Sequence, residues 1–411
     1  MKNERKLSLK TGEENLEHIL KCHQMVKGDI VRGENCYLYD SKNKRYVDFE
    51  SGLWCTALGH NNQRVNEAIK KQIDLVMNLG FRYTNFLAEE AAVALLDTVG
   101  LPDGKCVFLS SGSEAVEFGV QIAKNITGNK YLLTFMQSYL AAYGAAGNKY
   151  SDEWIGFDFE SCLTCKEKDE CNLNCEKIKN IPFESIGAVV FELGSSCGTV
   201  KFPPEGLVDL IAKEVKRNQG LIVVDEVTTG MGRTGKWYGF NHYKFKPDIV
   251  AVGKGLGNGY PVSAAAMSRE VAQELEEKSF GYGQSHQNSP LGCAVAKEVI
   301  NILKEERLVE RSYESGTILL NQLNEMKKKY GFIKEVRGRG LMVGVELSND
   351  ADNYIDSKYV HHKMLERGFM IGCNKLRNII LFLPAFTIAE NEIINLITNL
   401  NDIFRERKSL R

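Results

Sequence analysis

Strand-length apolar runs alternate along the chain with segments of helical periodicity. Four short apolar runs end in polar residues or glycine, at 106–109, 188–191, 221–224 and 249–252. Amphipathic stretches, in which apolar residues recur every three or four positions, lie at 114–124 and 207–215. Because strands that alternate with helices build parallel sheets covered on both faces, the pattern predicts an α/β fold with a mostly parallel central sheet. Ligands of such sheets bind beyond the carboxyl ends of the strands.

The last hundred residues follow a different pattern. The glycine-rich stretch 336–340 predicts a turn-rich joint that leads into an apolar run at 341–347. Thr387 and Glu390 have the spacing of a capping box in front of an amphipathic terminal helix. We expect a large domain at residues 61–300, with a Cys-rich insertion at about 151–180. Residues 1–60 and 301–411 are expected to form a smaller α+β domain.

The charge balance excludes some classes of partner. Of the 411 residues, 52 are Lys or Arg and 53 are Asp or Glu, which gives a net charge of −1. Binders of nucleic acid or of anionic membranes need a clustered cationic face. The polar N-terminus has no secretory signal, and no apolar run approaches the ~18 residues that span a bilayer. We expect a soluble cytoplasmic protein that binds neither nucleic acid nor membrane.

The chain contains eleven cysteines, and seven of them are scattered singly. In a chain without an export signal, such cysteines are expected to be reduced and to behave as small hydrophobic residues. The other four are crowded together as Cys162, Cys165, Cys171 and Cys175. Their spacing suits a tetrahedral Zn²⁺ or an iron–sulfur centre that staples the insertion. An exposed insertion with free or redox-paired thiols is the alternative, and both interpretations stay open.

A strand-to-helix turn at 110–115 is the first feature with potential chemistry. Gly112 lets the backbone approach an anion closely, and the free amides of a helix N-terminus attract phosphate. An ordinary helix N-cap at Ser113 is the alternative explanation for this turn.

Asp225 and Lys254 follow two further predicted strands. Two carboxylates, Asp225 and Glu226, stand at the end of a buried strand, where a charge needs a cationic partner such as a protonated ring nitrogen. Lys254 stands between glycines at another strand end, where desolvation suits a Schiff-base lysine. A turn-capping Asp and a solvated loop Lys are the alternatives. Because all three features occur in an order that one parallel sheet brings to one crevice, we favour a shared site.

The residues around Asp225 and Lys254 carry a family resemblance. The run 225–236, continuing through Lys246-Pro247-Asp248 to Gly253-Lys254-Gly255, closely resembles the class-III aminotransferases. These are fold-type-I enzymes that depend on pyridoxal 5'-phosphate, and the resemblance extends over most of the chain. It implies a homodimeric enzyme that moves an amino group between an amine or amino acid and a keto acid or aldehyde.

The resemblance also implies roles for individual residues. Lys254 would form the Schiff base with the cofactor and act as the general base, and Asp225 would keep the ring nitrogen protonated. Ser285 would reach the phosphate of the neighbouring subunit, so that the two active sites are shared. The remaining cofactor-binding positions are Gly112 and Ser113 at the phosphate, Val227 and Tyr139 on the two ring faces, Glu192 and Thr228.

The substrate side departs from the family. Leu381 stands where relatives that use α-amino acids commonly have a carboxylate-binding arginine, and Cys197 replaces the glutamate that gates it. The standard carboxylate clamp is therefore in doubt. Arg82, or alternatively Lys375 or Arg377, is a candidate anchor, although each is also explained as a surface cation. The segment that ends at Trp54 resembles the entrance of amine-using relatives, where an aromatic residue lines the substrate pocket; a plain core role is the alternative.

Two rival functions remain. Some class-III relatives are racemases, which return the proton to the α-carbon of the substrate. The stretch Gly230-x4-Gly235-Lys236 nearly matches a nucleotide-binding P-loop, but Trp237 stands where Ser or Thr must hold Mg²⁺.

Overall fold

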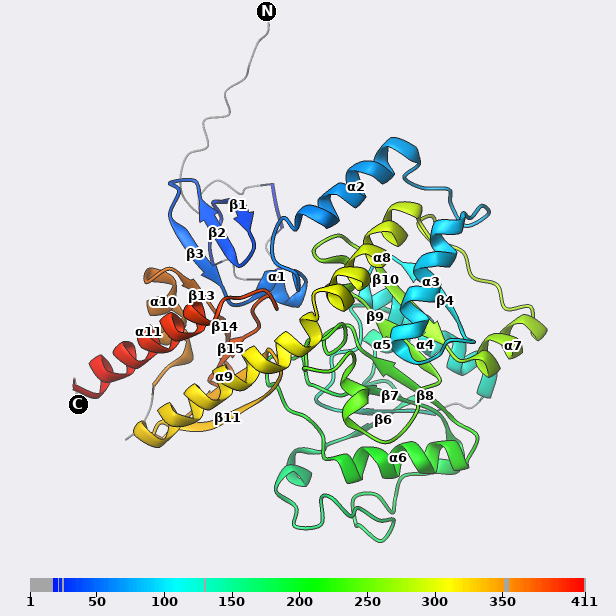
Figure 1. Cartoon of the computed structure of the whole chain (residues 1–411). Coiled ribbons are helices and arrows are strands. Elements are labelled where there is room, and N and C mark those ends of the chain that lie inside the picture. The colour runs from blue at the N-terminus through cyan, green and yellow to red at the C-terminus, as the bar shows by residue number, and fades with distance from the viewer. Residues whose placement is uncertain (1–17, 21, 24–25, 129–130, 351–354, 410–411) are drawn as a thin grey trace, which may run out of the picture.

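The computed structural model describes residues 18–20, 22–23, 26–128, 131–350 and 355–409. The chain forms a large part around a seven-stranded sheet and a smaller part around two four-stranded sheets (Figure 1). Within the residues described, no helix is long and apolar enough to cross a membrane.

The central sheet has the strand order β4-β10-β9-β8-β7-β5-β6. Strand β10 is antiparallel to both of its neighbours, and the other pairs are parallel. The predicted α/β fold with a mostly parallel sheet is therefore confirmed. The strands are β4 (Lys105–Leu109), β5 (Tyr131–Phe135), β6 (Trp154–Phe157), β7 (Ile186–Glu192), β8 (Leu221–Asp225), β9 (Ile249–Val252) and β10 (Ser263–Met267).

Helices cover both faces of this sheet. Every residue of β7, β8, β9 and β10 is buried, which explains why these strands are almost continuously apolar. Ala188 and Val190 pack beneath α4 and α7, whereas Val189 and Phe191 face the other core with α3, α6 and α8. The helices of this part are α2 (Gln63–Leu75), α3 (Phe86–Val99), α4 (Gly112–Thr127), α5 (Gly144–Gly147), α6 (Glu205–Arg217), α7 (Arg269–Glu277) and α8 (Pro290–Glu305).

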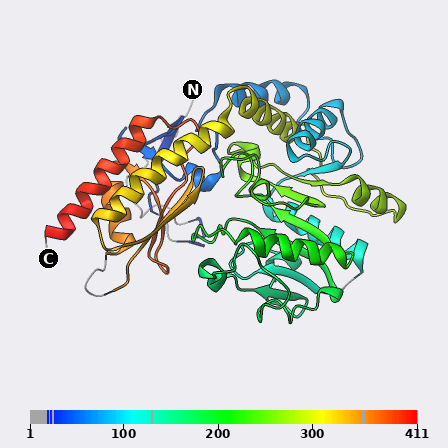
Figure 2. The same ribbon diagram turned by 60° about the horizontal axis from the view of Figure 1, so that its bottom comes forward.

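The smaller part joins the two ends of the described chain. Its first sheet pairs β1 (Ile30–Glu34), β2 (Tyr37–Asp40) and β3 (Arg45–Asp48) with β13 (Phe369–Met370), and its second has the order β11-β12-β15-β14. Figure 2 shows α9 and α11 side by side against this part. The predicted boundaries at residues 60 and 300 stay a prediction. The other elements are α1 (Ser51–Trp54), α9 (Leu308–Lys329), β11 (Ile333–Arg339), β12 (Met342–Leu347), α10 (Ser357–Glu366), β14 (Gly372–Asn374), β15 (Ile379–Phe382) and α11 (Glu390–Ser409).

Two local predictions were wrong. Residues 336–339 lie in strand β11, because they pair with β12 across a tight turn at Gly340, whose φ is +52°. Thr387 does not cap the terminal helix, which begins only at Glu390. Its hydroxyl is used elsewhere, donating to the side chain of Asn35.

A buried arginine connects the two parts. Arg233 lies on the loop after β8 and is only 2% exposed. Its Nη1 donates to the carbonyl oxygens of Leu341 (3.1 Å) and Pro384 (2.6 Å), and its guanidinium lies 4.6 Å from the ring centre of Phe386. Burial lowers the pKa of Arg233 to about 9. The large part is thus held to two separate segments of the smaller part by one side chain.

Candidate active site

A cavity of about 460 Å³ lies beyond the carboxyl ends of the central strands. Strand β8 ends at the cavity with Asp225, Lys254 follows β9 at its floor, and α4 begins at its side. This is the position in which open parallel sheets bind ligands. The lining residues are His23, Leu53, Trp54, Ser111, Gly112, Ser113, Tyr139, Leu140, Ser196, Cys197, Asp225, Val227, Thr228 and Lys254.

Lys254 is held in a defined position at the floor of the cavity. It begins a short 3₁₀ turn after β9, with a φ of +41° that side chains with a Cβ rarely adopt. Its Nζ donates to Oγ1 of Thr228 over 2.8 Å and lies 5.3 Å from the ring centre of Trp54. The amine is therefore aimed into the cavity by a strained backbone and one hydroxyl.

Asp225 is a buried carboxylate that forms no ion pair with any residue the structure describes. It is 3% exposed, and its Oδ1 accepts the N–H of Val227 over 3.0 Å. Burial, followed by repulsion from Glu192, raises the pKa of Asp225 well above its usual range. A cation bound beside Asp225 would restore the charged carboxylate.

Glu192 lies beside Asp225 in register on the neighbouring strand. Its Oε2 accepts the N–H of Tyr139 (2.8 Å), and its Oε1 accepts the N–H of Ser196 (3.0 Å). Burial raises the pKa of Glu192 to about 7 in spite of these bonds. Glu192 does not line the cavity; it positions the two segments that carry Tyr139 and Ser196.

The turn before α4 forms an anion-binding wall. Ser111, not Ser113, caps the helix: its Oγ accepts the N–H of Glu114, whose carboxylate accepts the N–H of Ser111 in return. The predicted alternative of a cap at Ser113 was wrong because the helix begins earlier. The hydroxyl of Ser113 instead accepts the N–H of Ala142, over 3.0 Å. The N-terminus of a 16-residue helix thus faces the cavity.

The glycine at this turn is required by close packing. A Cβ on Gly112 would stand 2.5 Å from Cγ1 of Val227, and a Cβ on Gly253 would stand 3.2 Å from Cα of Gly112. The turn can therefore pack this closely on Val227 and Gly253 because positions 112 and 253 lack side chains. A helix N-terminus, a buried acid without a cation and a positioned lysine together fit the phosphate, ring nitrogen and aldehyde of pyridoxal phosphate.

The structure brings together most of the predicted site residues. Besides Glu192 and the four crowded cysteines, Arg82 and Ser285 do not line the cavity of this chain. They are exposed on adjoining loops, and Nδ2 of Asn78 donates to the carbonyl oxygen of Ser285 (2.9 Å). Lys375 and Arg377 are exposed as well and do not line the cavity.

The position of Trp54 is compatible with both interpretations of it. It lines the cavity, and it is 5% exposed in an apolar cluster with Leu381 and Val200. His23, Leu53 and Leu140 also line the cavity and were not predicted as site residues. No sequence motif surrounds His23, so only the folded chain reveals it.

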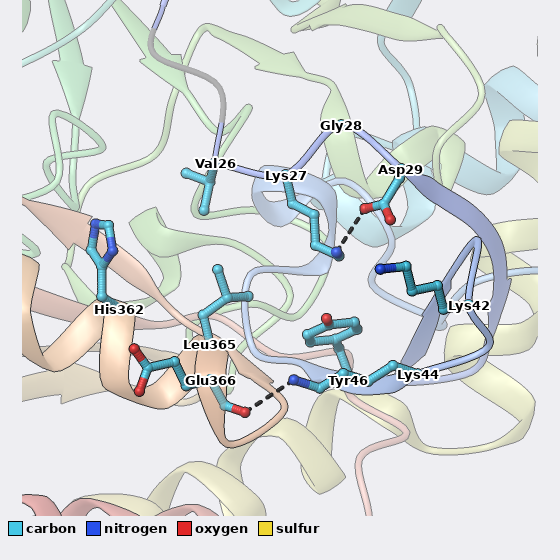
Figure 3. Close-up of a pocket in the computed structure, with 10 residues that line it drawn as sticks. All are labelled: Val26, Lys27, Gly28, Asp29, Lys42, Lys44, Tyr46, His362, Leu365 and Glu366. Carbon is cyan, nitrogen blue, oxygen red and sulfur yellow. Dashed lines mark hydrogen bonds and ion pairs between the residues drawn. The ribbon is translucent and has the colours of Figure 1, made fainter. Parts of the chain in front are cut away.

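A second cavity, of about 420 Å³, lies in the smaller part (Figure 3). Its lysines are largely occupied: Lys27 Nζ pairs with Asp29 (2.6 Å), and Lys44 Nζ donates to the carbonyl oxygen of Glu366 (3.0 Å). This cavity contains none of the predicted catalytic or cofactor-binding residues, so we place the chemistry in the first one.

The P-loop interpretation fails on the geometry of residues 230–236. The N–H groups of Gly230, Gly232 and Gly235 donate to the carbonyl oxygens of Glu226, Trp237 and Gly232. Lys236 donates to the carbonyl oxygen of Asn241. These groups already form hydrogen bonds within the protein, so they are not available to bind a phosphate.

The four crowded cysteines do not form a metal centre in the described structure. All are free thiols, with Cys162 buried and Cys165 and Cys175 exposed. Burial and the neighbouring thiol of Cys162 raise the pKa of Cys171 to about 11. Among the described residues, no group of three or more His, Cys, Asp or Glu is arranged to hold a metal ion. The predicted zinc or iron–sulfur centre is therefore not supported.

Comparison with known proteins gives a consistent result. The family model for class-III aminotransferases matches residues 20–404. The chain is 30% identical over 382 residues to the acetylornithine aminotransferase of Archaeoglobus fulgidus, covering 93% of this chain and 96% of that protein. It is 28% identical over 390 residues to the leucine/methionine racemase of Thermococcus litoralis, covering 88% of this chain and 87% of the racemase. The solved structure of an S-selective transaminase from Arthrobacter sp. matches with a TM-score of 0.86 and 26% identity, over 96% of this chain and 97% of that one.

Proposed function

We propose, from the premise that this chain belongs to the class-III aminotransferase family and is a pyridoxal-phosphate-dependent aminotransferase, that Lys254 is its catalytic lysine. The observation that carries this proposal is the meeting of Lys254, Asp225 and the N-terminus of α4 around one cavity. Borohydride treatment of the purified protein, followed by peptide mapping, should label Lys254. An unlabelled Lys254 in cofactor-loaded protein would contradict the assignment.

The residues divide the work of amino-group transfer. The bound cofactor supplies an electron sink for the charge left when a proton leaves the amine-bearing carbon of the substrate. Asp225 would hold the ring nitrogen in its protonated form, and this pairing would relieve the cost of burying its own carboxylate. The turn at Ser111–Ser113 would hold the phosphate, and Val227 and Tyr139 would cover the two ring faces.

Lys254 would move the proton. Its Nζ, held 2.8 Å from Oγ1 of Thr228, is the basic group at the floor of the cavity. Proton return to the cofactor gives a transaminase, whereas return to the substrate carbon gives a racemase. The aminotransferase relatives favour the first outcome, and the similarity to the leucine/methionine racemase keeps the second as an alternative. Incubation with single enantiomers separates them, because a transaminase forms one carbonyl product per site and a racemase only mixes the enantiomers.

We further propose a homodimer with shared active sites. The segments that carry Arg82 and Ser285 are exposed, and they display Phe81 (55%), Tyr83 (72%) and Phe86 (89%) to solvent. A second copy packed on this surface would cover those rings. Ser285 would then contact the phosphate bound by the other subunit, and Arg82 would be available to its substrate.

Hybrid dimers test the shared site. In a shared site, Lys254 comes from one subunit and Ser285 from the other. A hybrid dimer of Lys254→Ala with Ser285→Ala therefore has both substitutions in one site and none in the other. Random exchange between the inactive Lys254→Ala and the weakened Ser285→Ala variants should therefore give at least a quarter of wild-type activity, since half of the dimers are hybrids with one intact site. If each site uses only its own chain, mixing the two variants restores no activity.

A further inference from the structure

The turn at α1 has an unusual backbone conformation. Ser51, Gly52, Leu53 and Trp54 have φ values of +48°, +56°, +61° and +70°, so four consecutive residues lie in the left-handed region. Only Gly52 adopts this region without strain, because a Cβ crowds the backbone there. Such a conformation persists only where the surrounding contacts enforce it.

Asp48 supplies those contacts at the base of the turn. It is 3% exposed, and its Oδ1 accepts the N–H groups of Glu50 (2.8 Å) and Ser51 (3.0 Å). Its Oδ2 lies 2.8 Å from Nε2 of His60, which fixes the orientation of the carboxylate.

Hydrogen bonds also connect the turn to the end of the strand that carries Leu381. The N–H of Leu383 donates to the carbonyl oxygen of Phe49 (2.7 Å), and Oγ of Ser51 donates to the carbonyl oxygen of Leu383. Leu381 and Trp54 share one apolar cluster. The left-handed turn and this strand therefore form one wall.

This wall faces the reacting lysine. Leu53 and Trp54 both line the cavity, and the Trp54 ring centre lies 5.3 Å from Nζ of Lys254. Of the turn's four residues, only these two reach the cavity, and they do so because the backbone turns left-handed. A right-handed turn would send the same side chains in other directions.

We infer that Asp48, oriented by His60, is a positioning residue for substrate recognition, which holds the left-handed turn so that Trp54 packs against the apolar arm of the substrate. This inference rests on the proposed function. Asp48 contacts neither the cavity nor Lys254 in the described structure, so its effect on the substrate passes through Trp54.

The test uses two pairs of amino-group donors: isopropylamine with 1-phenylethylamine, and alanine with phenylalanine. Within each pair, the second donor carries an aromatic ring that the first one lacks. In the pair that reacts, Asp48→Ala should raise KM for the aromatic donor at least tenfold and leave kcat, the small donor and the spectrum of the bound cofactor unchanged. Asp48→Asn keeps an oxygen acceptor for the two N–H groups and should stay within threefold of wild type. If Asp48→Ala weakens both donors equally, the inference is overturned.

A double-mutant cycle shows whether Asp48 acts through Trp54. In a Trp54→Ala background, Asp48→Ala should have no further effect on the aromatic donor; full additivity would overturn the inference. His60→Ala should also raise KM for the aromatic donor, by a smaller factor than Asp48→Ala. This variant replaces Asp48→Ala in the test if Asp48→Ala does not fold. The proposed function is tested separately by borohydride labelling of Lys254, so its failure is distinguished from failure of this inference.

Asp40→Ala is the matched control. Asp40 is 5% exposed, and its Oδ1 accepts the N–H groups of Lys42 (3.0 Å) and Lys44 (2.9 Å), but it lies away from the cavity of Lys254. Asp40→Ala should lower the melting temperature and leave KM unchanged for both the aromatic and the small donor. A selective KM change in this variant would show that lost stability alone produces the effect, and would overturn the inference.

Discussion

Replacing Asp225 with asparagine should change activity and stability in opposite directions. The substitution preserves the shape of the side chain and an oxygen that accepts the N–H of Val227 (3.0 Å). It removes the charge that is proposed to pair with the ring nitrogen of the cofactor, and it removes the repulsion between Asp225 and Glu192.

The magnitude follows from the buried pair. Breaking one buried ion pair costs about 3–5 kcal/mol, so kcat/KM of Asp225→Asn should fall by about a hundredfold to a thousandfold or more. In the cofactor-free protein, the same substitution should instead increase stability. The carboxyl of Asp225 has a raised pKa and no ion-pair partner among the described residues, so a pH above the usual pKa of a carboxyl costs stability that asparagine avoids.

Two assays check the pair of outcomes. Single-turnover absorbance of the bound cofactor measures the half-reaction, and differential scanning fluorimetry measures the melting temperature of the cofactor-free protein at pH 8. A loss of activity below threefold would refute the assignment of Asp225 as the partner of the ring nitrogen, and a lower melting temperature of the cofactor-free variant would refute the raised pKa of its carboxyl.

Three further predictions concern packing, pH and thiols. Gly112→Ala should weaken cofactor affinity about 5- to 100-fold in a fluorescence titration, because its Cβ collides with Val227, whereas Gly331→Ala, which has open space, should not. Burial raises the pKa of Glu226 from 4.5 to about 7, so this group contributes stability below pH 4.5 that is lost as the pH rises through 7. Glu226→Gln should therefore remove about 3 kcal/mol of the pH dependence of unfolding between pH 4.5 and 8; an unchanged pH profile would argue against the shift. Cys162→Ser should cost about 1–2 kcal/mol in urea unfolding because its thiol is buried, and the exposed Cys165→Ser less than about 0.5; equal costs would contradict the described insertion.

Periodicity predicted the elements that position the chemistry. Buried parallel strands are short apolar runs that end in polar residues, and this pattern located both Asp225 and Lys254. Their convergence follows from sheet topology, since the carboxyl ends of parallel strands lie on one edge.

Other features depend on contacts that no local pattern contains. The left-handed turn before Trp54 includes one glycine, and the bonds from Asp48 that enforce it appear only in the folded chain. The helix cap was predicted two residues too late, at Ser113 instead of Ser111, because both hydroxyls lie at the same turn and the local sequence does not distinguish them. Cysteine spacing alone does not fix the distances between thiols in space, which is why the metal interpretation finds no support among the described residues.

The buried guanidinium of Arg233 restricts how the enzyme can open. Its Nη1 is anchored to Leu341 and Pro384 at a single point, and pulling the halves apart there would strand a desolvated cation without acceptors. Substrate is therefore expected to reach Lys254 without separation of the two parts at residue 233.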